Sequence, residues 1–157
     1  MKTERLLRVV YVLAIFLVGF ISAYLINFYS GEGFSINRNT TAPSNYLDAE
    51  NILVYEDRVV LNLEGARISN YMATGSMTPV FNENANGISV KPINENEIEV
   101  GDIISFWRED DLIVHRVIDS GVDSEGIFYI TKGDHAFSND GKIRFGDVEH
   151  KLVGLVY

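Results

Sequence analysis

The sequence contains no cysteine, which excludes disulfide bonds and thiolate metal ligands. It also has few basic residues outside its N-terminal end. Residues 30–157 contain 10 Lys and Arg against 21 Asp and Glu, a net charge of −11. Because nucleic-acid binding requires a basic surface, this composition argues against a nucleic-acid partner and is typical of a well-solvated protein surface.

Long apolar runs are absent after residue 30, but one is present before it. Residues 9–26 form an 18-residue stretch without a charge. With its flanking residues, a helix of this length crosses a hydrocarbon core of about 30 Å. Three basic side chains and one acidic side chain precede the stretch. The positive-inside rule therefore predicts a single-pass anchor over residues 1–29, with the N-terminus in the cytoplasm and the rest of the chain outside.

A cleaved secretory signal is the alternative to an anchor. Residues 21–23, Ile-Ser-Ala, end in a small residue and form a weak cleavage site. The apolar run exceeds the usual signal core of about 7–15 residues and continues past Ala23, which favours the uncleaved anchor.

Residues 30–50 are polar and rich in Asn, Thr, Ser and Gly, which predicts a linker. Asn39 begins an N-glycosylation acceptor triplet within it, and its use stays open.

Residues 51–157 lack any apolar run of helical length with a 3.6-residue period. Short β-branched runs alternate instead with Gly, Asn and Asp, which predicts a mainly β domain with a closed or folded-over antiparallel architecture. We expect residues 121–126 to connect two strands and the polar residues 82–99 to form a surface insertion. The expected strands are 52–55 and 58–63, paired as a hairpin, and 68–72, 88–91, 102–107, 112–118, 127–131 and 148–156.

Ser76 lies in a short stretch with the sequence Thr-Gly-Ser-Met-Thr-Pro, residues 74–79. A serine hydroxyl is a useful nucleophile only with a base within hydrogen-bond reach and with donors aimed at the developing oxyanion. Gly75 permits a turn that a β-carbon would block. The Thr74 hydroxyl and the Ser76 amide are expected to point at the same oxyanion. A Gly-Ser pair alone is a common loop dipeptide, so Ser76 is a candidate only together with a base.

His115 is the candidate base. It lies in an apolar stretch, Ile-Val-His-Arg-Val at residues 113–117, which is expected to be a strand. A histidine on such a strand is more often a satisfied core residue than a base. Scarcity favours the catalytic interpretation, because the chain has only two other histidines, His135 and His150, and His150 lies in a polar context near the C-terminus.

Asp134 and Asp140 lie in and after a Gly-containing turn. Asp134 ends the sequence Thr-Lys-Gly-Asp, residues 131–134, and Asp140 precedes a glycine. Each is a candidate to orient His115, although Asp beside Gly is also ordinary turn chemistry. A metal site built from His115, Asp134, His135 and Asp140 is a further alternative.

In this order, the motifs resemble those of type I signal peptidases, within the archaeal and endoplasmic-reticulum branch. The serine box of that branch is Ser-Gly-Ser-Met-x-Pro, here with Thr74 in place of the first serine. The other boxes are Gly-Asp before an apolar strand, Val-His-Arg-Val, and Thr-Lys-Gly-Asp with a second aspartate six residues on. They match residues 101–104, 114–117 and 131–140. In the last box His135 stands where relatives continue with asparagine.

The resemblance implies a fold and a set of roles. The fold is an antiparallel, β-barrel-like catalytic domain over residues 51–157, preceded by one N-terminal transmembrane helix. Ser76 is the implied nucleophile, His115 the general base and Asp140 the residue that orients it. Asp134 is implied as a supporting acid, and Thr74 with the Ser76 amide as oxyanion donors. No metal and no cofactor are implied.

The activity that the resemblance implies is that of a membrane-anchored serine endopeptidase. Such an enzyme removes signal peptides from translocated preproteins at the outer face of the cell membrane or the endoplasmic-reticulum membrane. Its implied partners are preprotein signal peptides with small residues at −1 and −3, the lipid membrane and the translocation machinery. Two alternatives stay open: a narrower processing peptidase on the same scaffold, and a catalytically silent, anchored β-rich domain that binds a partner.

Overall fold

The computed structural model describes Tyr11 and residues 13–19, 21–22 and 41–157, and the chain divides into two units, Met1–Arg38 and Asn39–Tyr157. In the first unit, the described residues are helical. No helix within the described ranges has the length and apolarity needed to cross a membrane. Most of the predicted anchor, and also Asn39, lie outside the described residues.

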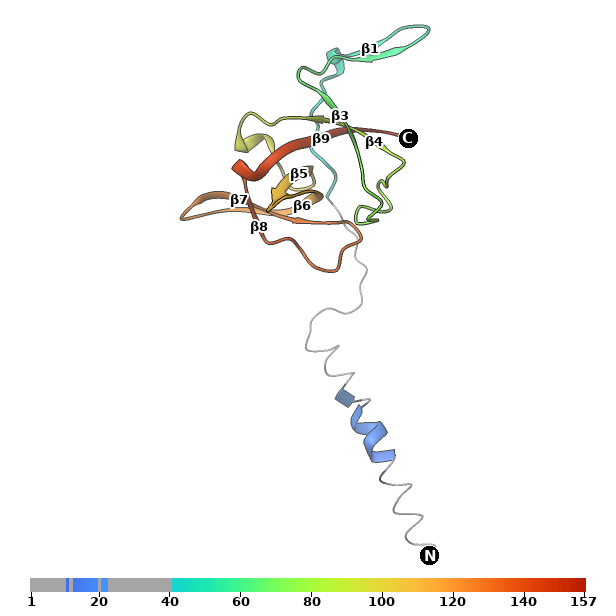
Figure 1. Cartoon of the computed structure of the whole chain (residues 1–157), viewed down its shortest axis with the longest axis vertical. Helices are drawn as coiled ribbons and strands as arrows, with labels where there is room; N and C mark the ends of the chain where they lie inside the picture. The colour runs from blue at the N-terminus through green and yellow to red at the C-terminus, as the bar shows by residue number, and fades with distance from the viewer. Residues whose placement is uncertain (1–10, 12, 20, 23–40) are drawn as a thin grey trace, which may run out of the picture. The chain divides into compact units, whose positions relative to one another are not determined.

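The second unit is a mainly antiparallel β protein (Figure 1). Seven of its strands form one sheet in the order β3-β4-β9-β5-β6-β7-β8, and β1 pairs with β2 in a separate hairpin. The strands are β1 Ile52–Val54, β2 Val59–Leu61, β3 Arg67–Asn70, β4 Asn86–Val90, β5 Ile103–Arg108, β6 Asp111–Asp123, β7 Gly126–Lys132, β8 Lys142–Arg144 and β9 Val148–Val156. Three short 3-10 helices complete the described elements: η1 Ala49–Asn51, η2 Glu95–Glu97 and η3 Phe145–Asp147.

The predicted hairpin near residue 52 is confirmed. Ile52 pairs with Leu61 and Val54 with Val59, in antiparallel register. All residues of both strands are solvent-exposed, and in Figure 1 β1 projects away from the seven-stranded sheet. The hairpin strands therefore do not contribute to the buried apolar clusters of the sheet.

The sheet carries a buried apolar cluster on each of its two faces. On β5, Ile104 and Phe106 belong to one cluster, whereas Ile103 belongs to the other. On β6, Val117 packs in the first cluster and Val114 against the second. This alternation follows from the two-residue period of a strand, and it explains why these runs are apolar on both sides.

Residues 121–126 differ from the expected connection. β6 continues to Asp123 and pairs with β7, with Gly121 opposite Phe128, so that only Ser124 and Glu125 form the turn. A β-carbon on Gly121 would lie 2.7 Å from Phe128 Cζ. The glycine is therefore a site of close packing within a strand rather than the start of a turn.

The expected surface insertion is also wrong in part. β4 lies between β3 and β9 inside the sheet, and Val90 is 2% exposed. Ala85 and Ile98, on either side of β4, are buried in the two clusters. Val90 belongs to the expected strand 88–91, whereas the polar residues around Ala85 and Ile98 hid these two core positions. β8 was not expected, because three residues with one apolar side chain give little signal.

Within the described part of the predicted linker, Ser44 attaches the chain to the sheet. Asp102 is fully buried and accepts hydrogen bonds from the amide and hydroxyl of Ser44 at 2.8 and 2.9 Å. Lys151 Nζ lies 2.7 Å from Asp102 Oδ2 and also donates to Ser44 Oγ and Glu97 O at 2.8 Å. A buried ion pair is tolerated only with such additional hydrogen bonds. The Gly-Asp motif at 101–102 is therefore an attachment point for the chain before β1.

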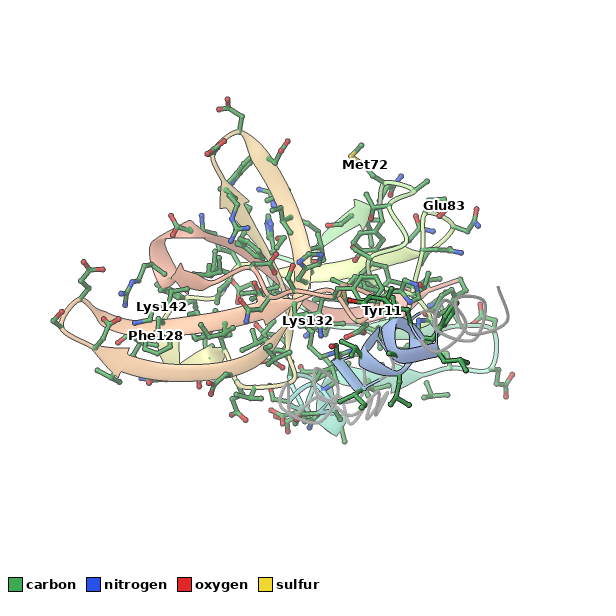
Figure 2. The ribbon with its side chains drawn as sticks, turned by 90° about the horizontal axis from the view of Figure 1, so that it is seen from below. Tyr11, Met72, Glu83, Phe128, Lys132 and Lys142 are labelled. Carbon is green, nitrogen blue, oxygen red and sulfur yellow. The ribbon has the colours of Figure 1, made fainter. Side chains whose placement is uncertain are left out.

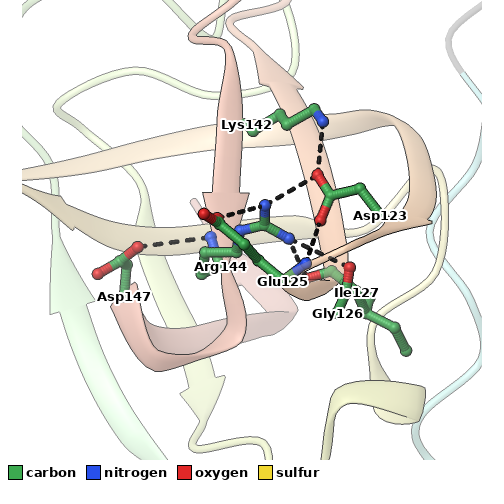
Figure 3. A network of polar contacts seen from close by, with 7 residues as sticks. All are labelled: Asp123, Glu125, Gly126, Ile127, Lys142, Arg144 and Asp147. Atoms are coloured by element: carbon green, nitrogen blue, oxygen red, sulfur yellow. Dashed lines mark hydrogen bonds and ion pairs between the residues drawn. The ribbon is translucent and has the colours of Figure 1, made fainter.

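A second polar network lies at the end of the β6–β7 hairpin (Figure 3). Asp123 Oδ2 accepts from Arg144 Nη2 at 2.9 Å and from Lys142 Nζ at 2.6 Å, and Arg144 also reaches Glu125 at 2.9 Å. Hydrogen bonds from Arg144, then from Lys142 and the Glu125 amide, hold the pKa of Asp123 well below its ordinary value. Lys142 Nζ also lies 4.1 Å from the centre of the Phe128 ring, and the two are labelled side by side in Figure 2. The network joins β8 to the hairpin.

Candidate active site

Ser76 lies in the loop between β3 and β4, next to a glycine with a left-handed backbone. Gly75 has φ +68°, a conformation that L-residues other than glycine rarely adopt. The loop closes on itself, since the Thr78 hydroxyl donates to Gly75 O at 2.8 Å. Met77 and Phe81 are 3% and 5% exposed and anchor the loop in one apolar cluster. The buried side chain of Met77 therefore fixes the position of the adjacent Ser76, which is partly exposed.

His115 lies on β6 and contacts Asp140. His115 Nδ1 and Asp140 Oδ2 are 2.7 Å apart, and both side chains are largely buried, at 13% and 12% exposed. Because a carboxylate only accepts hydrogen bonds, the proton of a neutral His115 ring lies on Nδ1. Nε2 then keeps its lone pair, which is the form that a general base requires.

Gly133 lies between His115 and the Ser76 backbone. A β-carbon built on Gly133 would lie 2.7 Å from Ser76 O and 2.9 Å from His115 Nε2. The same β-carbon position is thus close to both residues. The Nε2 side of the His115 ring therefore lies beside the Ser76 loop. The backbone of the same turn binds that loop directly, because the His135 amide donates to Ser76 O at 2.9 Å.

Asp134 has a different partner. Arg116 donates to both Asp134 oxygens, from Nε and Nη2, at 2.8 Å each. The two side chains are 4% and 5% exposed, and Arg116 Nη1 also donates to Gly101 O at 2.8 Å. Arg116 follows His115 on β6 and so projects from the opposite face of the strand. Asp134 therefore fixes the turn to β6 through Arg116, whereas the ion pair of His115 is with Asp140.

Three further contacts fix Asp140. The Asp140 amide donates to Thr131 O at 2.8 Å, and the Thr131 hydroxyl donates to Asp140 Oδ2 at 2.8 Å. Arg108, the last residue of β5, donates from Nη2 to Asp140 O. Thr131 is fully buried, so its hydroxyl has little freedom. Asp140 Oδ2 thus accepts from both Thr131 and His115, which fixes the carboxylate relative to the ring.

Thr74 and Ser76 bond to each other. The Thr74 hydroxyl donates to Ser76 Oγ at 3.2 Å, and the Ser76 amide donates to Thr74 Oγ1 at 3.4 Å. The two predicted oxyanion donors are therefore adjacent. In the described part of the chain, no hydrogen bond links Ser76 Oγ to His115.

A cleft of about 670 Å³ opens beside Ser76 and His115. One wall comes from residues 69–72, at and after the end of β3, and another from residues 111–115 of β6. The lining also includes the Ser76 loop, Ser89 of β4, Ser105 of β5, and His150 and Leu152 of β9. Burial, and secondarily the charge of Tyr157, raises the pKa of the wall residue Tyr71 to about 12, so this phenol stays neutral at ordinary pH.

Among the predicted site residues, the structure brings Thr74 to Ser76 and His115 to Asp140, joins the two pairs through the Gly133 turn, and places Asp134 on Arg116. Thr131, Arg116 and Arg108 also support the site, and none of them was predicted from the sequence. Thr131 and Arg116 are inside two recognised motifs, so their positions carried a signal, whereas Arg108 carried none. Within the described residues, no group of three or more His, Asp or Glu side chains is arranged to hold a metal ion.

Comparisons of the chain with protein-family models, with curated proteins and with solved structures found no match.

Proposed function

We propose that this chain is a membrane-anchored serine endopeptidase that removes signal peptides from translocated preproteins. The observation that carries the proposal is the 2.7 Å contact between His115 Nδ1 and Asp140 Oδ2, which leaves His115 Nε2 free beside the Ser76 loop at an open cleft. These are the base, the orienting acid and the nucleophile of acyl-transfer chemistry. The proposed domain is the barrel-like β domain of that enzyme class, behind one N-terminal membrane helix.

In the proposed mechanism, Ser76 Oγ attacks the scissile carbonyl carbon while His115 Nε2 takes its proton. Asp140 keeps the ring in the required tautomer and stabilises the imidazolium that forms. The Ser76 amide and the Thr74 hydroxyl stabilise the oxyanion, for which they exchange their mutual contact for hydrogen bonds to the substrate. The imidazolium then protonates the leaving amine, and water hydrolyses the acyl-enzyme. Catalytic hydrogen bonds often form only once substrate is bound, which accommodates the absence of a Ser76–His115 bond here.

The strands around the cleft support an extended peptide as the substrate. β7 pairs with β6 only from Arg116 onward, so the stretch 111–115 has no partner on that edge among the described strands. β3 is an edge strand paired on one side by β4. Unpaired strand edges recognise extended peptides through main-chain hydrogen bonds. Both edges belong to the walls of the cleft that contains Ser76.

The signal-peptide part of the proposal rests on the four ordered motifs and on the apolar run at residues 9–26. A signal peptide still in the bilayer presents its cleavage site close to the membrane surface. An enzyme anchored in the same bilayer meets that site in two dimensions. The proposed location is the cell membrane or the endoplasmic-reticulum membrane, with the catalytic domain outside the cytoplasm and the translocation machinery nearby.

The test is cleavage of a preprotein by membranes that contain the wild-type chain, Ser76→Ala or His115→Ala. We expect each substitution to lower cleavage by a factor on the order of 10⁴, as in other catalytic triads. Ser120→Ala, which changes an exposed serine of β6, is the matched control and should cleave like the wild type. Undiminished cleavage by Ser76→Ala would refute the proposal.

A further inference from the structure

Ser89, Ser105 and His150 form a polar floor in the cleft beside Ser76. They lie on β4, β5 and β9, which are neighbours in the sheet order β4-β9-β5. Ser105 is directly opposite His150, and Ser89 is opposite Leu152, two residues further along β9. Opposite residues, and residues two apart, project from the same face of a sheet. His150 therefore lies opposite Ser105 on one neighbouring strand and diagonal to Ser89 on the other, and all three residues line the cleft.

Within residues 41–157, the floor has hydrogen-bonding groups that lack protein partners. Ser89 is 5% exposed, yet within residues 41–157 neither its hydroxyl nor the His150 ring makes a side-chain hydrogen bond. Ser105 Oγ makes only a long contact, 3.4 Å, to His150 O. No fully buried side-chain nitrogen or oxygen in the described chain lacks a partner, so these polar atoms are open to the cleft. Burying a polar group costs free energy unless it is hydrogen-bonded, so these groups favour a ligand that can hydrogen-bond to them.

His150 is not a second general base in this arrangement. The base needs an orienting acid, and among the described residues the carboxylate contact belongs to His115 through Asp140. The surroundings also disfavour an anionic ligand, because Asp111 lines the same cleft and residues 30–157 carry a net charge of −11. A neutral hydroxyl or carboxamide fits these donors and acceptors best, since it can both donate and accept.

We propose that Ser89, Ser105 and His150 form a subsite that binds a neutral polar side chain of the substrate, a hydroxyl or a carboxamide. The inference rests on the proposed peptidase function and adds a preference to it. Polar groups that meet an apolar side chain of equal size lose their hydrogen bonds, so the subsite discriminates against that side chain. The other lining residues near it are largely apolar: Tyr71, Met77 and Val114. The preference is therefore confined to one substrate position.

The experiment uses the full chain in detergent and alanine-rich peptides that carry Thr or Val in turn at each position. Thr and Val have the same shape and differ in one hydroxyl group. Binding is measured by fluorescence anisotropy on Ser76→Ala, which reports the preference whether or not the wild type cleaves. At one position we expect the Thr peptide to bind roughly tenfold more tightly than the Val peptide. The difference should disappear when His150→Leu or Ser89→Ala is added, and persist when Ser120→Ala is added.

The outcomes separate the two proposals. Equal binding of Thr and Val peptides at every position, or a Thr preference that survives both floor substitutions, overturns the subsite. The absence of binding by any peptide overturns it as well. Cleavage by the wild type is measured in parallel on the same peptides and on a preprotein. The absence of cleavage overturns the peptidase function. The binding result still decides the subsite in that case. Thermal unfolding of each variant identifies a substitution that disturbs the fold, in which case the other floor variant decides.

Discussion

Gly133 packs directly against the imidazole of His115. A β-carbon on Gly133 would lie 2.9 Å from Nε2 and 3.1 Å from Cδ2 of that ring, and 2.7 Å from the carbonyl oxygen of Ser76. These distances leave no room for a side chain, because β-carbon contacts shorter than about 3 Å force the neighbouring atoms to move. Gly133 thus sets the distance between the strand that carries the proposed base and the loop that carries the proposed nucleophile.

The first prediction concerns this contact. Gly133→Ala should lower kcat/KM for peptide cleavage on the order of 10²-fold, because the added methyl group displaces the ring or the loop from the reactive geometry. Gly146→Ala is the control, since a β-carbon there has no neighbour within 4 Å. Activity equal to the wild type in Gly133→Ala would show that the ring and the loop are free to separate without consequence.

The second prediction concerns the hydroxyl of Thr131, which donates to Asp140 Oδ2 at 2.8 Å. Thr131→Val keeps the shape of the side chain and removes the donor, so the carboxylate is held less firmly against His115. We expect kcat to fall roughly tenfold, the value of one hydrogen bond. Thr131→Ser restores the donor and should recover most of the loss. A similar kcat for the Val and Ser variants would exclude a role for the hydroxyl.

The third prediction separates the roles of the two aspartates. Asp134→Asn leaves Arg116 buried without its bidentate partner, which should lower the free energy of unfolding by about 3–5 kcal/mol. Asp140→Asn should cause the larger loss of kcat, because it removes the acceptor that sets the His115 tautomer. Urea unfolding and steady-state kinetics on both variants measure the two effects. Full activity in Asp140→Asn with loss in Asp134→Asn would reverse the assignment.

The fourth prediction concerns the pH dependence of stability. The folded-state pKa of Asp123 is lowered from its ordinary value of 3.8, chiefly by hydrogen bonds from Arg144 and Lys142. A lowered pKa means that the network stabilises the fold fully above about pH 4 and loses this contribution as the pH falls further. Thermal unfolding of the wild type and Asp123→Asn should therefore differ near neutral pH and converge in acid. The difference should be small and should shrink with salt, because the network is exposed. A difference that grows toward low pH contradicts this assignment.

Most strands were predictable because their signal is local. Alternating and β-branched runs indicated the β1–β2 hairpin and the strands from β3 to β7 and β9, within a few residues at their ends. The two exceptions depend instead on contacts between strands. Gly121 reads as a turn residue, but it continues β6 because the Phe128 ring fills the space above it. β8 is too short to produce a pattern, and its place depends on pairing with β7.

The sequence by itself determined the mainly β class, the candidate nucleophile Ser76 and the candidate base His115, and it offered Asp134 and Asp140 as candidates for the orienting acid. These follow from composition, from the spacing of apolar residues and from the order of short motifs. Only the tertiary structure separated the acids, by placing Asp140 on His115 and Asp134 on Arg116. The reason is physical: a carboxylate's role depends on which group it meets across the fold, and no local pattern records a contact between residues 18 or 25 positions apart.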